Sequence, residues 1–237
     1  MNIVNTIKKI VNPFKIDINK YPNADLRRRK KLLKHFRINK ILDVGANIGQ
    51  YAELTRKLGF NGEIISFEPL TIAYKQLALN ALKDKKWQTH NFALGNKEEE
   101  VIINISKNLY SSSILDITPN HVDNASESNY IDKEEIQVKK LDELYNDLVC
   151  DDDIVFLKLD VQGFEKNVIE GAEKILHRIK GVQLEMSIIE LYKGEVLFLE
   201  MINLLKKEGF RLYSLENGFY NNDTGQLLQV DGIFFRD

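Results

Sequence analysis

The sequence predicts an α/β fold with a Rossmann-like, doubly wound sheet of about seven mostly parallel strands. Two observations indicate this fold. Aliphatic runs of strand length alternate with segments of helical periodicity along most of the 237 residues. One such run, Lys40 to Val44, also leads directly into a turn that contains Gly45 and Gly49. Glycine lets the backbone approach a ligand, and the N–H groups that open the following helix point toward it. We therefore expect a nucleotide-type ligand at this turn.

Seven segments have the length and composition of sheet strands. The run Ile154 to Leu159 is almost continuously apolar, which is typical of a central parallel strand that is buried on both faces. In chain order, the expected strands are 40–44, 63–67, 87–94, 154–159, 182–186, 210–215 and 232–235.

Helical spacing of apolar residues separates these strands. Gly59 is placed to end the first of the intervening helices, and Pro69 suits the first turn of the next one. Gly171 is a weak point in a later helix, at a cost of about 1 kcal/mol relative to alanine. The expected helices are 26–36, 48–58, 70–82, 141–148, 164–176 and 195–207.

A β-rich insertion is expected after residue 97. Val101, Ile103 and Ile105 alternate with other residues, which favours a hairpin over a crossover helix, and Ile136 to Val138 predicts a further short strand. Pro119 to Asn129 lacks an apolar period and is expected to be a surface loop.

The chain is expected to consist of an N-terminal helical extension, residues 1–37, and one cofactor-binding domain, residues 38–237. The extension contains a basic cluster at Arg27 to Lys31. Two interpretations of this cluster stay open: a solvated amphipathic face, or weak contact with an anionic membrane surface or an acidic substrate.

The overall composition excludes several classes of protein. Lysine and arginine number 33 against 35 acidic residues, so the net charge of −2 gives no case for nucleic-acid binding. The single cysteine, Cys150, cannot form an internal disulfide. No apolar run approaches the roughly 20 residues of a membrane span. We expect a cytoplasmic protein, and the sequence does not indicate its oligomeric state.

Three acidic residues are expected at the carboxyl ends of strands, where doubly wound sheets bind ligands. They are Asp43, Glu68 and Asp160. Glu68 follows the glycine turn by about 20 residues, the separation at which a carboxylate reaches the ribose hydroxyls of a bound nucleoside. The alternative for Glu68 is a solvated acid that caps a helix.

The composition of the turn favours one nucleoside in particular. A dinucleotide site needs three glycines, but here only Gly45 and Gly49 are present, and the lysine of a phosphate-binding loop is absent. A ligand with a positive centre and no phosphate fits better, because Asp43 can face an ammonium or sulfonium group. S-adenosylmethionine has this description.

At these motifs the sequence resembles class I methyltransferases and, more narrowly, the FkbM family of O-methyltransferases. The resemblance covers about residues 38–236. The motifs that carry it are Leu42 to Gly49, Phe67 to Pro69, Asn91 to Gly95, Ser111 to Leu115, and Leu157 to Glu165, with Leu141-Asp142 before the last. The family commonly has a glutamate where Gln162 stands, so no charge-dependent role is assigned to that position.

The resemblance implies a cofactor site along these motifs. It places the ribose at Glu68, beside Pro69, and the adenine near Phe92, Ala93 and Leu94. The methionine end is implied over the glycine turn. The turn residues assigned to the cofactor are Asp43, Gly45, Ala46, Asn47, Gly49 and Tyr51.

Transfer of a methyl group to a neutral alcohol requires alignment and removal of a proton. Asp160 is the first candidate for the general base and Glu185 the second, while Lys158 and Glu165 are placed to tune Asp160. The alternative for Asp160 is a helix cap.

The serine run and a metal ion are two further elements of the predicted site. Ser111, Ser112 and Ser113 are expected to close over substrate, or else to form a plain polar loop. Asp160, Glu185 and Asp231 could offer oxygen ligands to magnesium, although a carboxylate base needs no metal. Whether a divalent metal takes part stays open.

The sequence thus predicts an S-adenosylmethionine-dependent O-methyltransferase that acts on a hydroxyl of a sugar, glycan or related secondary metabolite. One alternative is a cofactor-binding module without turnover, and another is a methyltransferase for a non-sugar acceptor. Enzymes that methylate amino groups of nucleic acids usually carry Asn/Asp-Pro-Pro-aromatic after the fourth strand, where this chain has Asp160 to Gly163.

Overall fold

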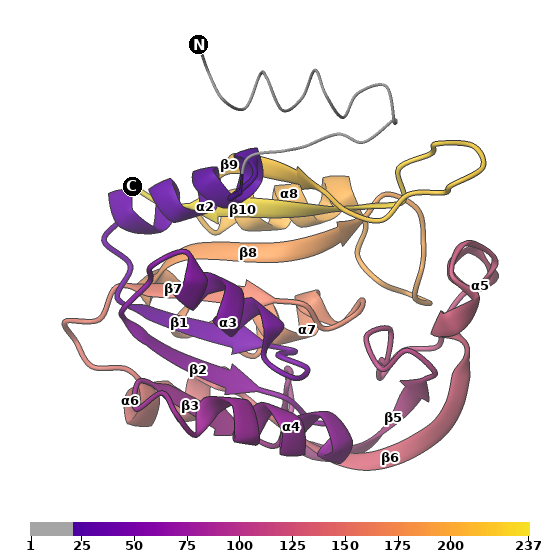
Figure 1. Cartoon of the computed structure of the whole chain (residues 1–237), viewed down its shortest axis with the longest axis horizontal. Coiled ribbons are helices and arrows are strands. Elements are labelled where there is room, and N and C mark those ends of the chain that lie inside the picture. Colours follow the sequence, from indigo (N-terminus) through magenta and orange to yellow (C-terminus); the bar gives the residue numbers. More distant parts are fainter. Residues whose placement is uncertain (1–20) are drawn as a thin grey trace, which may run out of the picture.

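In the computed structural model, which describes residues 21–237, the strands form a seven-stranded sheet in the order β3-β2-β1-β7-β8-β10-β9 (Figure 1). Residues 1–20, and with them most of the expected extension, lie outside the described part. The strands are β1 (Lys40–Val44), β2 (Glu63–Phe67), β3 (Trp87–His90), β7 (Val155–Leu159), β8 (Ile179–Ser187), β9 (Arg211–Asn217) and β10 (Gln229–Phe235).

The strand directions confirm the predicted doubly wound fold. The strands β3, β2, β1, β7 and β8 pair in parallel, whereas β10 is antiparallel to both of its neighbours. The chain runs outward from β1 to β3 and then returns to place β7 beside β1. Ligands of doubly wound sheets bind at such a reversal, beyond the carboxyl ends of the strands.

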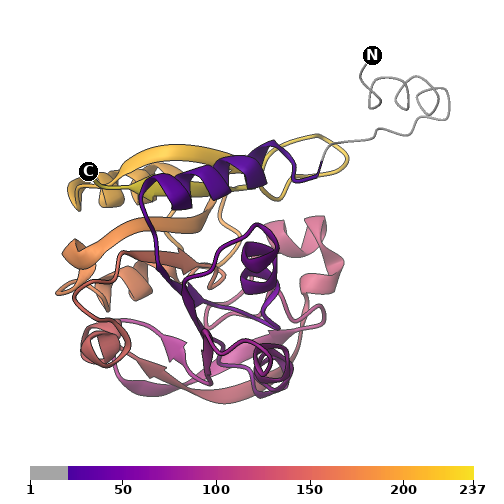
Figure 2. The same cartoon turned by 60° about the vertical axis from the view of Figure 1, so that its left-hand side comes forward.

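Helices cover both faces of the sheet (Figures 1 and 2). On one face, α2 (Ala24–His35), α3 (Gln50–Lys57) and α4 (Thr71–Ala81) pack over alternate strand residues such as Ile41 and Phe156. On the other face, α6 (Leu141–Leu148), α7 (Glu165–Glu170) and α8 (Phe198–Lys207) pack over Leu42 and Leu157. All five residues of β7 are buried, as expected for a central strand between two helical layers.

The expected β-rich insertion forms a second sheet of three strands in the order β4-β6-β5. The strands are β4 (Ala93–Leu94), β5 (Glu99–Ser106) and β6 (Tyr130–Lys139), and β5 pairs antiparallel with β6. β6 is much longer than the expected strand 136–138, because its exposed polar half is held by pairing with β5 and not by an apolar face. β5 and β6 extend away from the main sheet (Figure 1).

The sequence predicted a single strand at 87–94, which the structure divides. β3 ends at His90, and the side chain of Asn91 donates hydrogen bonds to the carbonyl oxygens of Glu68 and Pro69, both at 2.9 Å. These bonds turn the chain, so that β4 joins the second sheet by pairing with β6.

Two other expected elements also differ from the structure. The predicted loop 119–129 contains the short helix α5 (Pro119–Asn124) and a 3-10 turn at Ser126–Ser128. This helix can form without an apolar period, because the buried His121 contacts Tyr192 and this tertiary contact stabilises it. The predicted helix 164–176 ends at Glu170, where a Cβ on Gly171 would lie 1.9 Å from the carbonyl oxygen of Gly95.

The basic cluster on α2 has two environments. Arg27, Arg28, Lys30 and Lys31 are exposed, whereas Arg29 is buried and forms an ion pair with Glu216 of β9 at 2.5 Å. The expectation of a wholly solvated face is therefore wrong for Arg29, and membrane or substrate contact of the exposed residues stays a prediction. None of the helices in residues 21–237 has the length and hydropathy needed to cross a bilayer.

Candidate active site

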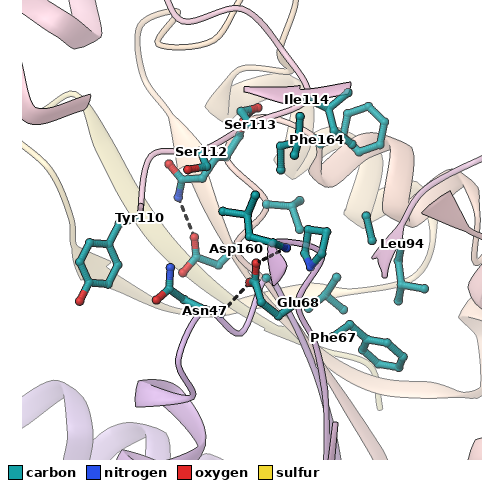
Figure 3. Close-up of a pocket in the computed structure, with 18 of the residues that line it drawn as sticks. Asn47, Phe67, Glu68, Leu94, Tyr110, Ser112, Ser113, Ile114, Asp160 and Phe164 are labelled. Atoms are coloured by element: carbon teal, nitrogen blue, oxygen red, sulfur yellow. Dashed lines mark hydrogen bonds between the residues drawn. The ribbon is translucent and has the colours of Figure 1, made fainter. Parts of the chain in front are cut away.

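A cavity of about 260 Å³ lies beyond the carboxyl ends of β1, β2 and β7 (Figure 3). Each strand contributes its last residues to the wall: Gly45 follows β1, Glu68 follows β2, and Asp160 follows β7. Glu185 of β8 completes the acidic part, and loop residues 109, 110 and 112–114 of the insertion cover the opposite side. The cavity thus occupies the position that the strand order predicts for a ligand.

The charge of the cavity wall has one sign. Glu68, Asp160 and Glu185 line it, and no lysine, arginine or histidine among residues 21–237 does. The remaining wall is mostly apolar, with Leu94 and Phe164 among its members. Such a cavity suits a ligand that carries positive charge together with an apolar or aromatic part, because an anionic ligand would face carboxylates without a compensating cation.

Gly45 is required by close packing at the end of β1. Its φ of +72° is in the left-handed region, and a Cβ at this position would lie 1.8 Å from the carbonyl oxygen of Asp160. Gly49, with φ +96°, is the N-cap of α3, and its Cβ would lie 2.6 Å from the Trp87 ring. Gly45 therefore lets the end of β1 pack against the end of β7, and Gly49 lets the start of α3 pack against β3.

We predict that Gly45→Ala lowers the free energy of unfolding by about 3 kcal/mol, since it combines left-handed backbone strain with a steric clash. Gly194→Ala is the matched control: its φ is +78°, but no atom lies within 4 Å of the added Cβ, so about 1 kcal/mol is expected. Urea unfolding of both variants measures the difference. Equal losses would contradict the role of the Asp160 contact.

Glu68 is a buried carboxylate held by two backbone groups. Its Oε2 accepts a hydrogen bond from the Asn47 N–H at 2.8 Å, and its Oε1 accepts one from the Leu70 N–H at 2.9 Å. Burial raises the pKa of Glu68 to about 7, against the lowering effect of these two bonds. Each oxygen keeps a further lone pair, and the carboxylate lines the cavity. Glu68 can therefore accept hydrogen bonds from two ligand hydroxyls.

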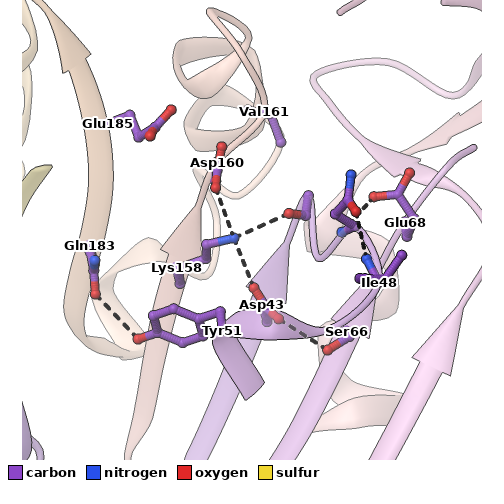
Figure 4. Close-up of polar contacts among 12 residues, drawn as sticks. Asp43, Ile48, Tyr51, Ser66, Glu68, Lys158, Asp160, Val161, Gln183 and Glu185 are labelled. Atoms are coloured by element: carbon purple, nitrogen blue, oxygen red, sulfur yellow. Dashed lines mark hydrogen bonds and ion pairs between the residues drawn. The ribbon is translucent and has the colours of Figure 1, made fainter. Parts of the chain in front are cut away.

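Asp43 does not line the cavity, and Figure 4 shows its carboxylate directed toward Lys158 and Ser66. Its fully buried carboxylate pairs with Lys158 at 3.0 Å and accepts a hydrogen bond from the Ser66 hydroxyl at 3.2 Å. This geometry does not agree with the expected direct contact between Asp43 and a cationic ligand, because the carboxylate already faces a lysine. Sequence reasoning could not find this partner, which is 115 positions away.

Lys158 connects Asp43 to the cavity wall (Figure 4). Its Nζ lies 3.5 Å from Asp160 Oδ2 and donates to the carbonyl oxygen of Gly45 at 3.2 Å. Burial alone would lower the pKa of Lys158, but the carboxylates of Asp43 and Asp160 raise it above its usual value. Lys158 therefore stays charged, and its ammonium faces the Asp160 carboxylate. The tuning role of Lys158 stays a prediction.

Asp160 and Glu185 are bridged by Gln162 at the cavity wall. The side-chain amide Nε2 of Gln162 donates to Asp160 Oδ1 at 2.7 Å and to Glu185 Oε2 at 2.9 Å. Burial and the nearby charge of Asp160 raise the pKa of Glu185 well above its usual value. Across residues 21–237 no backbone N–H donates to the Asp160 carboxylate, so this carboxylate does not cap α7.

Glu165 is buried at the start of α7 and does not line the cavity. Its Oε1 accepts a hydrogen bond from the Val161 N–H at 3.1 Å. Burial raises the pKa of Glu165 to about 7. In the folded protein this group therefore binds its proton at a higher pH than in the unfolded chain.

This pKa predicts a pH dependence of stability. Between about pH 4.5 and 7 the folded state holds more protons than the unfolded state, so stability falls as the pH rises through this window. For a shift of this size the loss is about 3 kcal/mol. Glu165→Gln should remove this contribution to the pH dependence of stability. Urea unfolding of the wild-type protein and of the variant at pH 5 and pH 8 measures it. An equal loss in the variant would show that Glu165 is not the group responsible.

The structure brings ten of the eighteen predicted site residues to the cavity and places eight elsewhere. Those on the cavity wall are Gly45, Asn47, Glu68, Pro69, Ala93, Leu94, Ser112, Ser113, Asp160 and Glu185. Those outside it are Asp43, Ala46, Gly49, Tyr51, Phe92, Ser111, Lys158 and Glu165.

Several of the residues outside the wall have structural contacts instead. Ala46 belongs to the core under α3. Tyr51 donates to Gln183 Oε1 at 3.2 Å, and burial raises the pKa of Tyr51 to about 12. Phe92 packs against the core beneath the Lys139 ammonium, which lies 4.5 Å from the ring centroid. The carbonyl oxygen of Ser111 lies 3.2 Å from the Tyr192 hydroxyl.

The structure adds cavity residues that sequence reasoning missed, among them Leu109, Tyr110 and Gln162. Leu109 and Tyr110 come from a loop without periodicity, so no pattern marks them. Backbone strain gives an independent signal: of the four non-glycine residues with positive φ in the described chain, Asn47, Leu109 and Gln162 line the cavity. Strain of this kind persists where surrounding structure enforces it, and it gathers at functional sites.

The arrangement of the acidic side chains bears on whether a divalent metal ion binds at this site. Within residues 21–237, no three or more histidine, cysteine, aspartate or glutamate side chains are arranged to hold a metal. Asp160, Glu185 and Asp231 share one region, and burial together with the charge of Asp160 raises the pKa of Asp231 to about 6. Gln162 supplies hydrogen bonds to the first two carboxylates.

Comparison with known proteins identifies the family. The family model described as methyltransferase FkbM domain matches residues 43–212, which is well over half of the chain. The chain belongs to the FkbM methyltransferase family. This FkbM protein is therefore an S-adenosylmethionine-dependent methyltransferase. A search of curated proteins gave no match.

Solved structures similar to this FkbM methyltransferase include several methyltransferases. The plantazolicin methyltransferase BamL, in complex with a desmethylPZN analog and SAH, is 9% identical with a TM-score of 0.49, and the match covers 89% of this chain and 84% of that one. A putative caffeoyl-CoA O-methyltransferase from Staphylococcus aureus is 9% identical with a TM-score of 0.48, covering 100% and 93%. A putative RNA methyltransferase from Pyrococcus horikoshii is 13% identical with a TM-score of 0.47, covering 93% and 88%. No inference about the acceptor rests on these likenesses.

Proposed function

We propose that this protein is an O-methyltransferase whose acceptor is an uncharged hydroxyl compound of the sugar, glycan or related secondary-metabolite class. The observation that carries the proposal is the pair of bridged carboxylates, Asp160 and Glu185, in a cavity wall to which the described part of the chain contributes no basic side chain.

The cavity residues fit S-adenosylmethionine. Glu68 presents free lone pairs for the two ribose hydroxyls, and the acidic wall complements the positive sulfonium and ammonium groups. Ala93, Leu94 and Phe164 form an apolar wall suited to adenine. When bound, S-adenosylmethionine supplies a methyl group that leaves sulfur as a bond forms to the acceptor oxygen, with the C–S electron pair remaining on sulfur.

Asp160 is the residue that takes the acceptor proton in this proposal. It lines the cavity, is about one-third exposed, and has fixed orientation through Gln162 and Lys158. The Lys158 ammonium stabilises its ionised form, which is the form that can accept a proton. Glu185 holds a proton more readily, because burial and the charge of Asp160 raise its pKa. In this proposal Asp160 is therefore the general base, and Glu185 is not.

The charge of the wall also selects among acceptors. A phosphorylated or carboxylated acceptor would approach Asp160 and Glu185 without meeting a cation of the wall, so its binding would be disfavoured. A neutral polyhydroxylated compound can donate hydrogen bonds to the same carboxylates. Tyr110, which is exposed at the cavity, offers an aromatic face for the apolar side of a sugar ring. These features support the neutral hydroxyl class.

A screen of acceptors tests the proposal. The purified protein is incubated with S-adenosylmethionine labelled in its methyl group and with matched pairs of compounds: free sugars and their phosphates, glycans, hydroxylated metabolites, and amines of similar size. We expect methylation of neutral hydroxyl compounds and a rate at least tenfold lower for the phosphates. Methylation confined to amines or to phosphorylated compounds would overturn the proposal.

Calorimetry separates turnover from simple cofactor binding. S-adenosylmethionine should bind the protein, whereas NADH should not, because the turn lacks the third glycine of a dinucleotide site. Binding of S-adenosylmethionine without methylation of any acceptor class would favour a cofactor-binding module.

A further inference from the structure

The neutral side chain of Gln162 makes hydrogen bonds to two carboxylates of the cavity wall and to Tyr192. Its Nε2 lies between two carboxylates, 2.7 Å from Asp160 Oδ1 and 2.9 Å from Glu185 Oε2. A carboxylate oxygen of an ionised group can only accept hydrogen bonds, so the two hydrogens of one amide are both needed to hold the pair together. Without them the half-buried Asp160 carboxylate would lie near Glu185 with no donor from Gln162 between the two acids.

A tyrosine fixes which end of the Gln162 amide faces the acids. The hydroxyl of Tyr192 lies 2.6 Å from Gln162 Oε1, and donation to that atom leaves Nε2 for the carboxylates. Burial, reinforced by the charge of Glu185 and by Tyr130, raises the pKa of Tyr192 well above its usual value, so its hydroxyl stays a donor. Tyr192 itself is fully buried and packs against His121.

The backbone of Gln162 is held as well. Its carbonyl oxygen accepts a hydrogen bond from the Ser113 hydroxyl at 2.7 Å, and its φ of +54° is in the left-handed region. Ser113 belongs to the serine run of the insertion, and Tyr192 follows β8, so two separate segments converge on this residue. Gln162 thus combines a strained backbone with hydrogen bonds at its side-chain amide and at its backbone carbonyl. This combination indicates a more specific role than the filling of space.

Several charged side chains surround the pair formed by Asp160 and Glu185. Lys158 of β7 faces Asp160 from one side, while Asp231 of β10 and Glu165 of α7 add negative charge near Glu185. The charge of Lys158 also favours the ionised form of Glu185, and Gln162 adds a hydrogen bond to each of the two carboxylates. Removal of these hydrogen bonds leaves only one cation for several acids.

We propose that Gln162 is the positioning residue of the reaction, which holds Asp160 ionised and aligned for proton removal by bridging it to Glu185, with Tyr192 locking the bridge. This inference rests on the proposed function, because it assumes that Asp160 takes a proton from a hydroxyl acceptor. It also accounts for the serine run: Ser113 anchors the bridge and does not need to touch the acceptor.

Gln162→Leu tests the inference, because leucine has similar bulk and no hydrogen-bond donor. We expect kcat to fall at least tenfold, and the acidic limb of the kcat/KM profile to move up by about one pH unit, since both carboxylates lose donors that favour their ionised forms. Gln162→Glu keeps the shape and adds a third acid, so its acidic limb should move in the same direction. Tyr192→Phe should give a smaller loss with the same direction of shift.

Two measurements separate this inference from its alternatives. Calorimetry should show S-adenosylmethionine affinity within about threefold of wild type in each variant, because Glu68 is untouched. A carbon NMR titration of labelled glutamate, which needs no acceptor, should place the pKa of Glu185 higher in Gln162→Leu than in wild type. If the wild-type protein methylates no hydroxyl compound, but the pKa of Glu185 is still higher in Gln162→Leu than in wild type, only the proposed function is overturned. Unchanged kcat, pH profile and titration in Gln162→Leu would overturn the role of Gln162.

Discussion

Asp160→Asn is expected to lower kcat by about 10²- to 10⁴-fold, the usual contribution of a positioned general base. The asparagine side chain keeps the shape of aspartate and can still accept a hydrogen bond from Gln162, so the wall should keep its geometry. It cannot take a proton from the acceptor, and it cannot pair as an anion with Lys158. S-adenosylmethionine affinity should stay within about threefold, because the ribose partner is Glu68 at the end of another strand.

Single-turnover rates and calorimetry on the same preparation check this expectation. Asp223→Asn, which changes an exposed carboxylate outside the cavity, is the matched control and should leave both quantities unchanged. Glu185→Gln should lose less activity than Asp160→Asn, because Glu185 holds its proton more tightly and no lysine pairs with it in the described chain. Full activity in Asp160→Asn would show that the proton leaves by another route.

The elements of the sheet were predictable from sequence because burial imposes simple patterns. β2 was expected at 63–67 and is found there, and the apolar run at 154–159 is the central strand β7. The acidic residues at strand ends were also predictable, since parallel strands bring their carboxyl ends to one edge of the sheet. Glu68 and Asp160 therefore fell on the cavity wall from spacing alone.

The rest of the site could not be predicted, because it depends on contacts between distant segments. Asp43 was expected to face the ligand, but Lys158 from a different strand neutralises it below the surface. Gln162 was assigned no charge-dependent role, and only the fold shows that two carboxylates and Tyr192 meet at its amide. Leu109 and Tyr110 of the insertion loop follow no period, so their place on the wall left no signal in the sequence, whereas the serine run pointed to Ser112 and Ser113.

The second large effect is expected at Glu68, whose protonation should control cofactor affinity. Its pKa of about 7 means that the carboxylate is mostly ionised at pH 8 and mostly protonated at pH 6. The ionised form accepts two hydroxyl protons and attracts a sulfonium, so affinity should rise with pH. If only that form binds, the Kd for S-adenosylmethionine is about tenfold weaker at pH 6 than at pH 8.

Glu68→Gln removes both the charge and its titration. At pH 8 we expect the Kd to weaken by roughly 10- to 150-fold, which corresponds to the loss of about 1.5 to 3 kcal/mol for hydrogen bonds to a charged group. The remaining pH dependence should be nearly flat, apart from any titration of the ligand's own amino group, which both proteins share. Calorimetry at pH 6, 7 and 8 measures all of these values.

Glu165→Gln provides the matched control for that experiment. Burial raises the pKa of Glu165 to about 7 as well, but its side chain lies at the start of α7 and off the cavity wall. Its replacement should therefore leave the pH dependence of S-adenosylmethionine binding as in wild type, while it changes the pH dependence of unfolding. If Glu165→Gln flattened the binding curve and Glu68→Gln did not, the ribose contact would have to be sought on a different carboxylate than Glu68.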